Sequence, residues 1–362
     1  MDASKLVINR TTSPKKLGKL EDLVFGKSFS NHMLTCEWDS TNGWHAPQIN
    51  PYGPLALDPA SCVLHYAFEC FEGLKVFKDA EGRLRMFRPE NNINRLNLSS
   101  DRICLPTMDI AEGVELLRKF VELEKDMVPD QKGYALYLRP TMIGTQNTLG
   151  VGAPHKAMFF VIASPVGPYY STGFKAVKLE ATEYAVRAWP GGVGNRKLGA
   201  NYAPCIRPQL EAATRGYQQN LWLFDGHVTE VGTMNLFMAF QNSDGTKELC
   251  TPPLDGTILE GITRLSILEL ARERLGPEWK VAERPIHINE VLTRSKNGEL
   301  LEIFGSGTAA VVSPVKEIAY NGEQIVVPLQ PSKECGPLTE QVSQWISDIQ
   351  YGVEEHPFCV PF

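Results

Sequence analysis

The sequence lacks the features that mark several large classes of protein. Its longest clearly apolar run, residues 157–163, is far too short to span a bilayer. The net charge of −6 leaves no excess of positive charge for binding nucleic acid or an anionic membrane. The first residues contain no apolar stretch like that of a signal peptide, and the early Asp2 disfavours an organelle transit sequence. We therefore expect no nucleic-acid or membrane partner and a cytoplasmic location, with the mitochondrial matrix as the alternative for a mature form.

Disulfide, metal and nucleotide motifs are also absent. The eight cysteines include no Cys-x-x-Cys pair, and the seven histidines include no His-x-x-x-His pair. Lys197 is followed by Leu198 rather than by serine or threonine, and Gly192-Val-Gly194 does not continue into Gly-x-Gly-x-x-Gly. We expect reduced thiols, no metal, and neither of these two phosphate-binding loops.

A chain of 362 residues is long enough for two domains. The Pro- and Gly-rich stretch 164–173 is the best candidate for a linker between them. We predict a smaller N-terminal α/β domain over 1–166, a linker over 167–176 and a larger C-terminal domain over 177–362 that carries Lys197. Antiparallel strands joined by hairpins, with helices set apart, predict an α+β fold of mixed α/β type. Strands are expected over 64–77 and 134–140, a hairpin turn at 225–226, and helices from 89 and over 111–126, 209–216, 262–275 and 338–351.

One glycine-rich loop, 187–204, holds a single lysine, Lys197. Glycine allows positive φ and close backbone approach, so such a loop suits an enclosed ligand, although it also suits a solvated surface turn. Three further features favour an anion: the helix start at Gly261-Ile-Thr263, the Gly305-Ser-Gly-Thr308 loop, and Arg95. Each alone also fits a helix cap, a turn or a solvated arginine. Together with Glu230, at the end of a hairpin, they are the parts needed to hold pyridoxal 5′-phosphate.

Several segments of the chain, among them those of Lys197, Glu230 and Thr308, resemble the branched-chain-amino-acid aminotransferases, fold-type IV pyridoxal-phosphate enzymes of the class-IV aminotransferase family. The matching segments run in order from about residue 25 to 352. They are 25–33, 64–73, 137–140, 186–189, Lys197-Leu-Gly-Ala-Asn-Tyr202, Glu230-Val-Gly-Thr-Met-Asn235, 251–256 and Phe304-Gly-Ser-Gly-Thr308. The resemblance implies a two-domain enzyme with its active site at the domain interface.

The resemblance also implies a role for each cofactor residue. Lys197 forms the Schiff base and moves the proton, Glu230 faces the pyridine nitrogen, and Tyr202 bonds the 3′ oxygen of the ring. The phosphate is held by Arg95, by the amides of Ile262 and Thr263, and by Thr308. Arg187 lies near the cofactor. The full expected cofactor set is Arg95, Arg187, Lys197, Tyr202, Glu230, Thr233, Asn235, Leu259, Gly261, Ile262, Thr263, Gly307 and Thr308.

The implied substrates are L-leucine, L-isoleucine and L-valine, with 2-oxoglutarate and L-glutamate as the second pair. The carboxylate is expected at Tyr137, Thr308 and Ala309, with Arg139 beside them. Side-chain pocket residues are expected at Phe25, Tyr66, Phe71, Leu149 and Val151, of which Tyr66, Leu149 and Val151 reach in from the partner of a homodimer. The alternatives are a D-amino-acid aminotransferase or aminodeoxychorismate lyase of the same fold and, more remotely, a non-catalytic pyridoxal-phosphate-binding protein.

One departure from the family concerns cysteine. In mammalian members a Cys-x-x-Cys redox pair follows the Gly-Ser-Gly-Thr loop, whereas this chain has Ala310 and Ser313 there. We expect no thiol switch of that kind.

Overall fold

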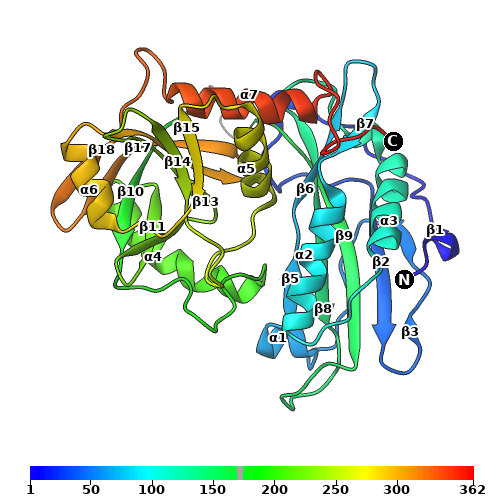
Figure 1. Cartoon of the computed structure of the whole chain (residues 1–362). Coiled ribbons are helices and arrows are strands. Elements are labelled where there is room, and N and C mark those ends of the chain that lie inside the picture. The colour runs from blue at the N-terminus through cyan, green and yellow to red at the C-terminus, as the bar shows by residue number, and fades with distance from the viewer. Residues whose placement is uncertain (169–173) are drawn as a thin grey trace. The chain divides into compact units, whose positions relative to one another are not determined.

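The structure is a computed structural model that describes residues 1–168 and 174–362 (Figure 1). The chain divides into two compact units. The first runs from Met1 to the segment 169–173 and also takes in Arg196–Ala200 and Asp348–Phe362; the second comprises the rest, up to Asn195 and over Asn201–Ser347. The predicted domain limits at 166 and 177 stay a prediction. Residues 169–173 of the predicted linker lie outside the described residues.

The first unit is built on one sheet with the order β1-β4-β2-β9-β8-β6-β7, in which β3 pairs with β2 and β5 with β8. Its pairs are antiparallel except for β1 with β4. In the centre, Tyr137 of β8 lies opposite Ser164 of β9, and Arg139 lies opposite Ile162. The strands are β1 (Val7–Ile8), β2 (His32–Asp39), β3 (Gly43–Trp44), β4 (Gln48–Pro51), β5 (Glu69–Phe71), β6 (Leu74–Lys78), β7 (Leu84–Met86), β8 (Ala135–Gly144) and β9 (Lys156–Val166).

Two longer helices belong to this unit. Helix α2 (Pro89–Arg102) starts with proline, which suits a first helical position, and it lies alongside β5 (Figure 1). Helix α3 (Ile110–Leu123) begins where the Asp109 side chain accepts from the Glu112 amide, and it buries Leu116, Leu117 and Phe120. Both predicted helices are confirmed, and short 3₁₀ turns lie at Ala3–Lys5, Leu20–Asp22 and Lys125–Met127.

The strand expected over 64–77 is wrong at its start. A short helix, α1 (Cys62–Tyr66), occupies those residues, and Ala67 ends it in the left-handed region with φ of 53°. The chain then turns and β5 begins at Glu69. The apolar and aromatic residues of 62–66 do not distinguish one turn of helix from a strand, which explains the error.

The second unit has its own sheet, with the order β12-β11-β10-β17-β16-β13-β14-β15 and with β18 paired to β17. This sheet is mixed: β10 runs parallel to β11 and β17, and β14 runs parallel to β15, so the expectation of antiparallel strands alone is wrong here. The predicted hairpin is confirmed, because Asp225 and Gly226 join β11 and β12 with φ of 48° and 69°. The strands are β10 (Val177–Thr182), β11 (Gln219–Phe224), β12 (His227–Val231), β13 (Asn235–Gln241), β14 (Lys247–Thr251), β15 (Trp279–Glu283), β16 (Leu300–Gly307), β17 (Val311–Tyr320) and β18 (Glu323–Val326).

Of the remaining helices, two agree with the predictions, one begins earlier than predicted and one was not predicted. Helix α4 (Ala203–Thr214) begins well before 209, and α6 (Ile288–Lys296) was not expected. Helix α5 (Ile262–Arg274) and helix α7 (Pro337–Gln350) confirm the helices over 262–275 and 338–351. A 3₁₀ turn at Gly199–Asn201 precedes α4. Among the described residues, no helix is both long and apolar enough to cross a membrane.

Candidate active site

In the first unit, one face of the sheet gathers polar and aromatic side chains. Side chains alternate along a strand, so Glu69 and Phe71 of β5 share a face with their cross-strand neighbours on β8. That face continues along β8 to Tyr137 and Arg139, two predicted substrate residues. The Arg139 guanidinium donates to the Tyr137 hydroxyl at 3.1 Å. That hydroxyl lies where a side chain at Gly73 would collide with it, which explains the glycine.

The segment that carries Lys197 docks on β5 of this unit. The Phe71 amide donates to the Lys197 carbonyl at 3.1 Å, and Cys70 and Leu198 form an antiparallel bridge. The Lys197 amide donates to Ser99 Oγ of α2 at 2.9 Å. The lysine backbone is therefore fixed by both the strand and the helix of the first unit.

The amine of Lys197 and the guanidinium of Arg139 contact the same aromatic ring. Lys197 Nζ lies 4.9 Å from the centroid of the Phe71 ring, and Arg139 Cζ lies 4.6 Å from it. Glu69 interacts electrostatically with both cations, but burial outweighs them and raises the pKa of its carboxyl above the ordinary value. The structure thus brings Lys197, Phe71, Tyr137 and Arg139 together; Glu69, on which no sequence prediction fell, lies among them.

Arg95, predicted to hold the phosphate, forms a buried ion pair on the other side of the sheet. Its Nε donates to Glu72 Oε1 at 2.7 Å and its Nη2 donates to Glu72 Oε2 at 2.9 Å. Arg95 and Ser99 are four residues apart and lie on the buried side of α2. Sequence reasoning missed Glu72, although the alternation Cys70, Glu72 against Glu69, Phe71 indicates that it faces α2.

A small cavity of about 180 Å³ lies on the face that carries Tyr137. Phe25, another predicted substrate residue, packs edge-on against the Tyr137 ring at 4.8 Å between centroids. Ser164 also lines the cavity, and its buried hydroxyl has no hydrogen-bond partner among the described residues. The lining residues are Phe25, Gly26, Phe29, Tyr137, Arg139, Ile162, Ala163 and Ser164.

The three residues expected to reach into a partner's site lie on the surface of the first unit. Leu149 and Val151 are 66% and 79% exposed, and Tyr66 is 40% exposed. The Tyr66 hydroxyl donates to the Leu149 carbonyl at 2.5 Å. This bond joins two predicted pocket residues that are far apart in sequence.

In the second unit, Glu230 sits at the end of β12 with its carboxylate held from several directions. Its Oε1 accepts from Asn235 Nδ2 at 3.1 Å and from the Leu259 amide at 3.3 Å. Its Oε2 lies 2.7 Å from Arg187 Nη2, and the side chains of both residues are more than nine-tenths buried. Arg187 also donates to the carbonyls of Thr257 and Gly194. The structure therefore brings Glu230, Arg187, Asn235 and Leu259 together.

Two glycines allow close packing beside the partners of this carboxylate. A side chain at Gly261 would collide with Asn235 Oδ1, and one at Gly194 would collide with the methyl group of Ala188. Gly261 is also the N-cap of α5, so the amides of Ile262 and Thr263 are not used by the helix itself. Backbone N–H groups at a helix start are suited to binding an anion.

Other predicted cofactor and substrate residues of the second unit lie at turns. Tyr202 is the N-cap residue of α4, and Thr233 lies in the exposed turn between β12 and β13. Gly307 ends β16, and Thr308 and Ala309 lie half-buried between β16 and β17.

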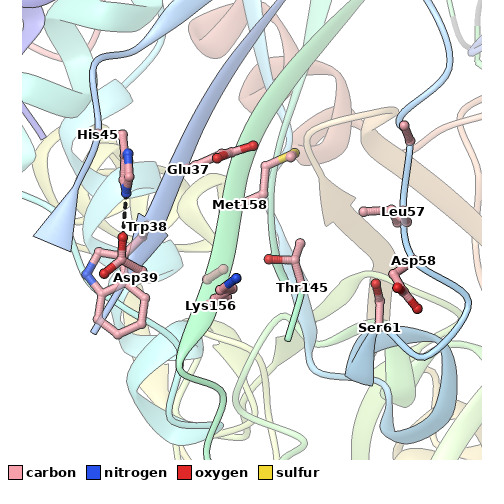
Figure 2. A pocket seen from close by; sticks show the side chains of 12 residues that line it. Glu37, Trp38, Asp39, His45, Leu57, Asp58, Ser61, Thr145, Lys156 and Met158 are labelled. Atoms are coloured by element: carbon pink, nitrogen blue, oxygen red, sulfur yellow. Dashed lines mark hydrogen bonds and ion pairs between the residues drawn. The ribbon is translucent and has the colours of Figure 1, made fainter. Parts of the chain in front are cut away.

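A larger cavity of about 290 Å³ in the first unit contains none of the predicted site residues (Figure 2). It lies between the ends of β2 and β9 and the segment before α1. Two of its lining residues are hydrogen-bonded to each other: His45 Nε2 lies 2.6 Å from Asp39 Oδ2. Lys156 and Asp58 face the same space (Figure 2). Among the described residues, no group of three metal-ligating side chains is found.

Comparison with known proteins identifies the family. The family described as amino-transferase class IV matches residues 69–318. The chain belongs to this family. The match confirms the predicted family, and it confirms pyridoxal 5′-phosphate as the cofactor on which this class of aminotransferase depends.

Relatives of this class-IV aminotransferase include two from Saccharomyces cerevisiae. One, a mitochondrial branched-chain-amino-acid aminotransferase, is 61% identical over 97% of this chain and 91% of its own length. The other, a cytosolic branched-chain-amino-acid aminotransferase, is 59% identical over 98% of this chain and 96% of its own length. They confirm the predicted enzyme class, branched-chain-amino-acid transamination, and they show that relatives occur in both compartments.

Solved structures agree with the fold of this class-IV aminotransferase. A branched-chain aminotransferase from Thermoproteus uzoniensis, solved with norvaline, matches with a TM-score of 0.70 and 25% identity, over 90% of this chain and 98% of that chain. A branched-chain aminotransferase solved with pyridoxamine 5′-phosphate matches with a TM-score of 0.66 and 24% identity, over 88% and 95%. The mixed α/β fold, predicted as fold type IV, is confirmed.

Proposed function

We propose that this chain transfers the amino group of L-leucine, L-isoleucine and L-valine to 2-oxoglutarate, with Lys197 as its catalytic lysine. The observation that carries the proposal is the docking of Lys197 on β5. Its backbone is fixed at both the amide and the carbonyl, and its amine lies over Phe71 beside Arg139. A lysine that must attach to a cofactor and then move a proton needs a backbone held in a fixed place, so that its amine returns to the same position.

The residue types predicted for the cofactor fit pyridoxal 5′-phosphate. That cofactor supplies, when bound, an aldehyde that takes the amino group and a ring that accepts electrons. Glu230 would face the ring nitrogen, because a buried carboxylate stabilises a protonated pyridine. The amides of Ile262 and Thr263 would hold the phosphate together with Arg95 and Thr308. Tyr202 would donate to the ring oxygen, and Lys197 Nζ would take the proton from Cα of the substrate.

The face around Tyr137 fits the amino-acid substrate. Tyr137 and Arg139 supply a hydroxyl and a cation for a carboxylate, and Phe25 and Phe71 supply apolar surface. An aliphatic pocket distinguishes one methylene by only about 10–200-fold, so all three branched-chain amino acids should react.

We further propose a homodimer in which Tyr66, Leu149 and Val151 of one subunit enter the partner's site. Supporting this, the two aliphatic side chains are mostly exposed, and the Tyr66 hydroxyl of α1 donates to the backbone carbonyl of Leu149. Exposed apolar side chains that are held in place are typical of an interface.

All eight cysteines are free, which suits a reducing compartment. We propose the cytoplasm, with the mitochondrial matrix as the alternative.

The test is a spectrum of the purified holoenzyme before L-leucine, after L-leucine and after 2-oxoglutarate. We expect the cofactor band to be lost and then to return, because the two half-reactions convert the cofactor and restore it. D-alanine in place of L-leucine should leave the band unchanged. A band that responds to D-alanine would favour a D-amino-acid aminotransferase, and one that never responds would favour a non-catalytic binding protein.

A further inference from the structure

Glu69 is a second carboxylate near the proposed catalytic lysine, and the function proposed above does not use it. It is the first residue of β5, and it shares a face of that strand with Phe71. Its Oε2 accepts from the Gly199 amide at 2.8 Å, two residues after Lys197. Glu69 therefore binds the segment that carries Lys197.

Gly199 and Glu69 fit each other. A Cβ at position 199 would collide with Glu69 Oε2. The backbone of Gly199 does not have positive φ, so the need for glycine comes from the carboxylate and not from backbone strain. The glycine of the Lys197-Leu-Gly sequence is thus explained by a side chain about 130 positions earlier.

The segment from Lys197 to Gly199 is held by hydrogen bonds and by an antiparallel β-bridge. Ser99 accepts from the Lys197 amide, the Phe71 amide donates to the Lys197 carbonyl, and Cys70 bridges Leu198. The bond from Gly199 to Glu69 ends on a carboxylate, so it is charge-assisted and stronger than a neutral bond.

Glu69 also balances charge. Lys197 Nζ and the Arg139 guanidinium lie within 5 Å of the Phe71 centroid, so these two cations repel each other there. The groups that face Glu69 electrostatically are Arg139 of β8 and Lys197 of the docked segment, and its neighbour Cys70 lies on β5 itself. A carboxylate in this position offsets the repulsion between the cations.

We propose that Glu69 is a positioning residue for Lys197: it fixes the lysine segment through the Gly199 amide, and its negative charge stabilises Lys197 and Arg139 on one ring. The inference rests on the proposed catalytic role of Lys197. It assigns no contact between Glu69 and substrate. Burial keeps the pKa of Glu69 above the ordinary value, so its charge is lost at a higher pH than that of an exposed glutamate.

The first test measures amide hydrogen exchange in the peptide that covers Leu198 and Gly199, in the apoenzyme and the holoenzyme. Glu69→Ala should speed exchange at Gly199 about tenfold or more, as loss of a bond to a charged acceptor predicts. Glu69→Gln keeps an acceptor oxygen and should change it much less. The matched control is Glu37→Gln, which removes a carboxylate from an exposed position on β2. Unchanged exchange in Glu69→Ala would overturn the proposal.

The second test is a double-mutant cycle on apoenzyme stability. Gly199→Ala should destabilise the wild type through its collision with Glu69, and it should cost clearly less in a Glu69→Ala background, where that oxygen is absent. Additive effects would contradict the proposed fit.

The third test uses the kcat of the holoenzyme and needs only Glu69→Gln, so it stands even if Glu69→Ala does not fold. At neutral pH the variant should be about fivefold slower, as a neutral acceptor replaces a charged one. The ratio of wild-type to variant kcat should fall towards one as acid protonates Glu69. A ratio that does not change with pH would exclude the charge role. Peptide mapping after borohydride reduction separately tests whether the cofactor is attached to Lys197; attachment elsewhere would refute the proposed function without altering the exchange result at Gly199.

Discussion

Lys197 of the first unit and Glu230 of the second are held in different ways. The first is proposed to carry the reaction, and the second is proposed to stabilise the cofactor ring. Glu230 is fixed through its side chain, by Asn235, the Leu259 amide and Arg187. Lys197 is fixed through its backbone, by Ser99 and Phe71, while its amine lies on a ring face. Directional bonds lock the carboxylate, whereas a cation–ring contact depends only weakly on direction.

This difference matches what each group is proposed to do. A carboxylate that stabilises a charged ring should not move, so a rigid and buried setting favours it. A lysine that attaches, detaches and moves a proton needs a fixed base and a mobile end. The bonds described above thus lie on the side chain of Glu230 and on the backbone of Lys197.

The largest effect is expected for Lys197→Ala, which removes the amine and keeps the backbone bonds to Ser99 and Phe71. We expect kcat to fall by about 10⁴-fold or more, because both covalent attachment and proton transfer are lost. Steady-state assays with L-leucine and 2-oxoglutarate measure this effect. Lys156→Ala, at an exposed position of β9, is the control. Activity within tenfold of the wild type would exclude Lys197 as the catalytic lysine.

Glu230→Gln removes the negative charge in the second unit and keeps an oxygen that can accept the same hydrogen bonds. The amide oxygen can still accept from Asn235 and Leu259, but the charge that faces Arg187 is gone. We expect the cofactor to stay bound and kcat to fall by about 10²–10³-fold, the range for losing one preorganised electrostatic partner. Cofactor content by absorbance and turnover by assay are measured on the same sample. Near-normal turnover would contradict the role assigned to Glu230.

Phe71→Leu tests the mobile end, because it removes the ring beneath the two cations and keeps an apolar side chain. Cation–ring contacts contribute about 0.5–2 kcal/mol, so kcat/KM should fall by roughly 2–30-fold. Phe71→Tyr keeps the ring face and should stay close to the wild type. Equal losses in both variants would indicate that packing, not the ring face, is what matters at this position.

In the first unit, the sequence predicted Lys197 itself better than the residues that hold its segment. Lys197, Tyr137 and Arg139 stand in recognisable segments, and the alternation of β8 places the last two on one face. Glu69 and Ser99 could not be assigned, because they meet Lys197 only through a docked segment about 100 positions away. Such contacts depend on tertiary structure that no local pattern encodes.

Around Glu230, the hairpin and the start of α5 could be predicted from the local sequence. Asp-Gly at 225–226 fixes the turn before Glu230, and Gly261 marks the start of α5. The bonds from Arg187 to Thr257 and Gly194 were not, because backbone carbonyls carry no sequence signal. The parallel pairs of β10 and β14 were missed for a similar reason: strand direction depends on the path of the connections.

The smallest effect expected is on stability, and it comes from the free energy that ionising the buried Glu69 carboxyl costs the folded protein. Burial raises the pKa of Glu69 in the folded state above its ordinary value of 4.5, so ionising it costs stability. Below pH 4.5 the group is protonated in both the folded and the unfolded states, and the penalty is absent. As the pH rises from 4.5 through the raised pKa, the penalty appears and then stays constant. Glu69→Gln should therefore match the wild type in Tm in acid and become slightly more stable at neutral pH. A variant that is less stable than the wild type at neutral pH would show that the carboxylate stabilises the fold, and the contrast with Glu37→Gln shows whether the effect belongs to this site.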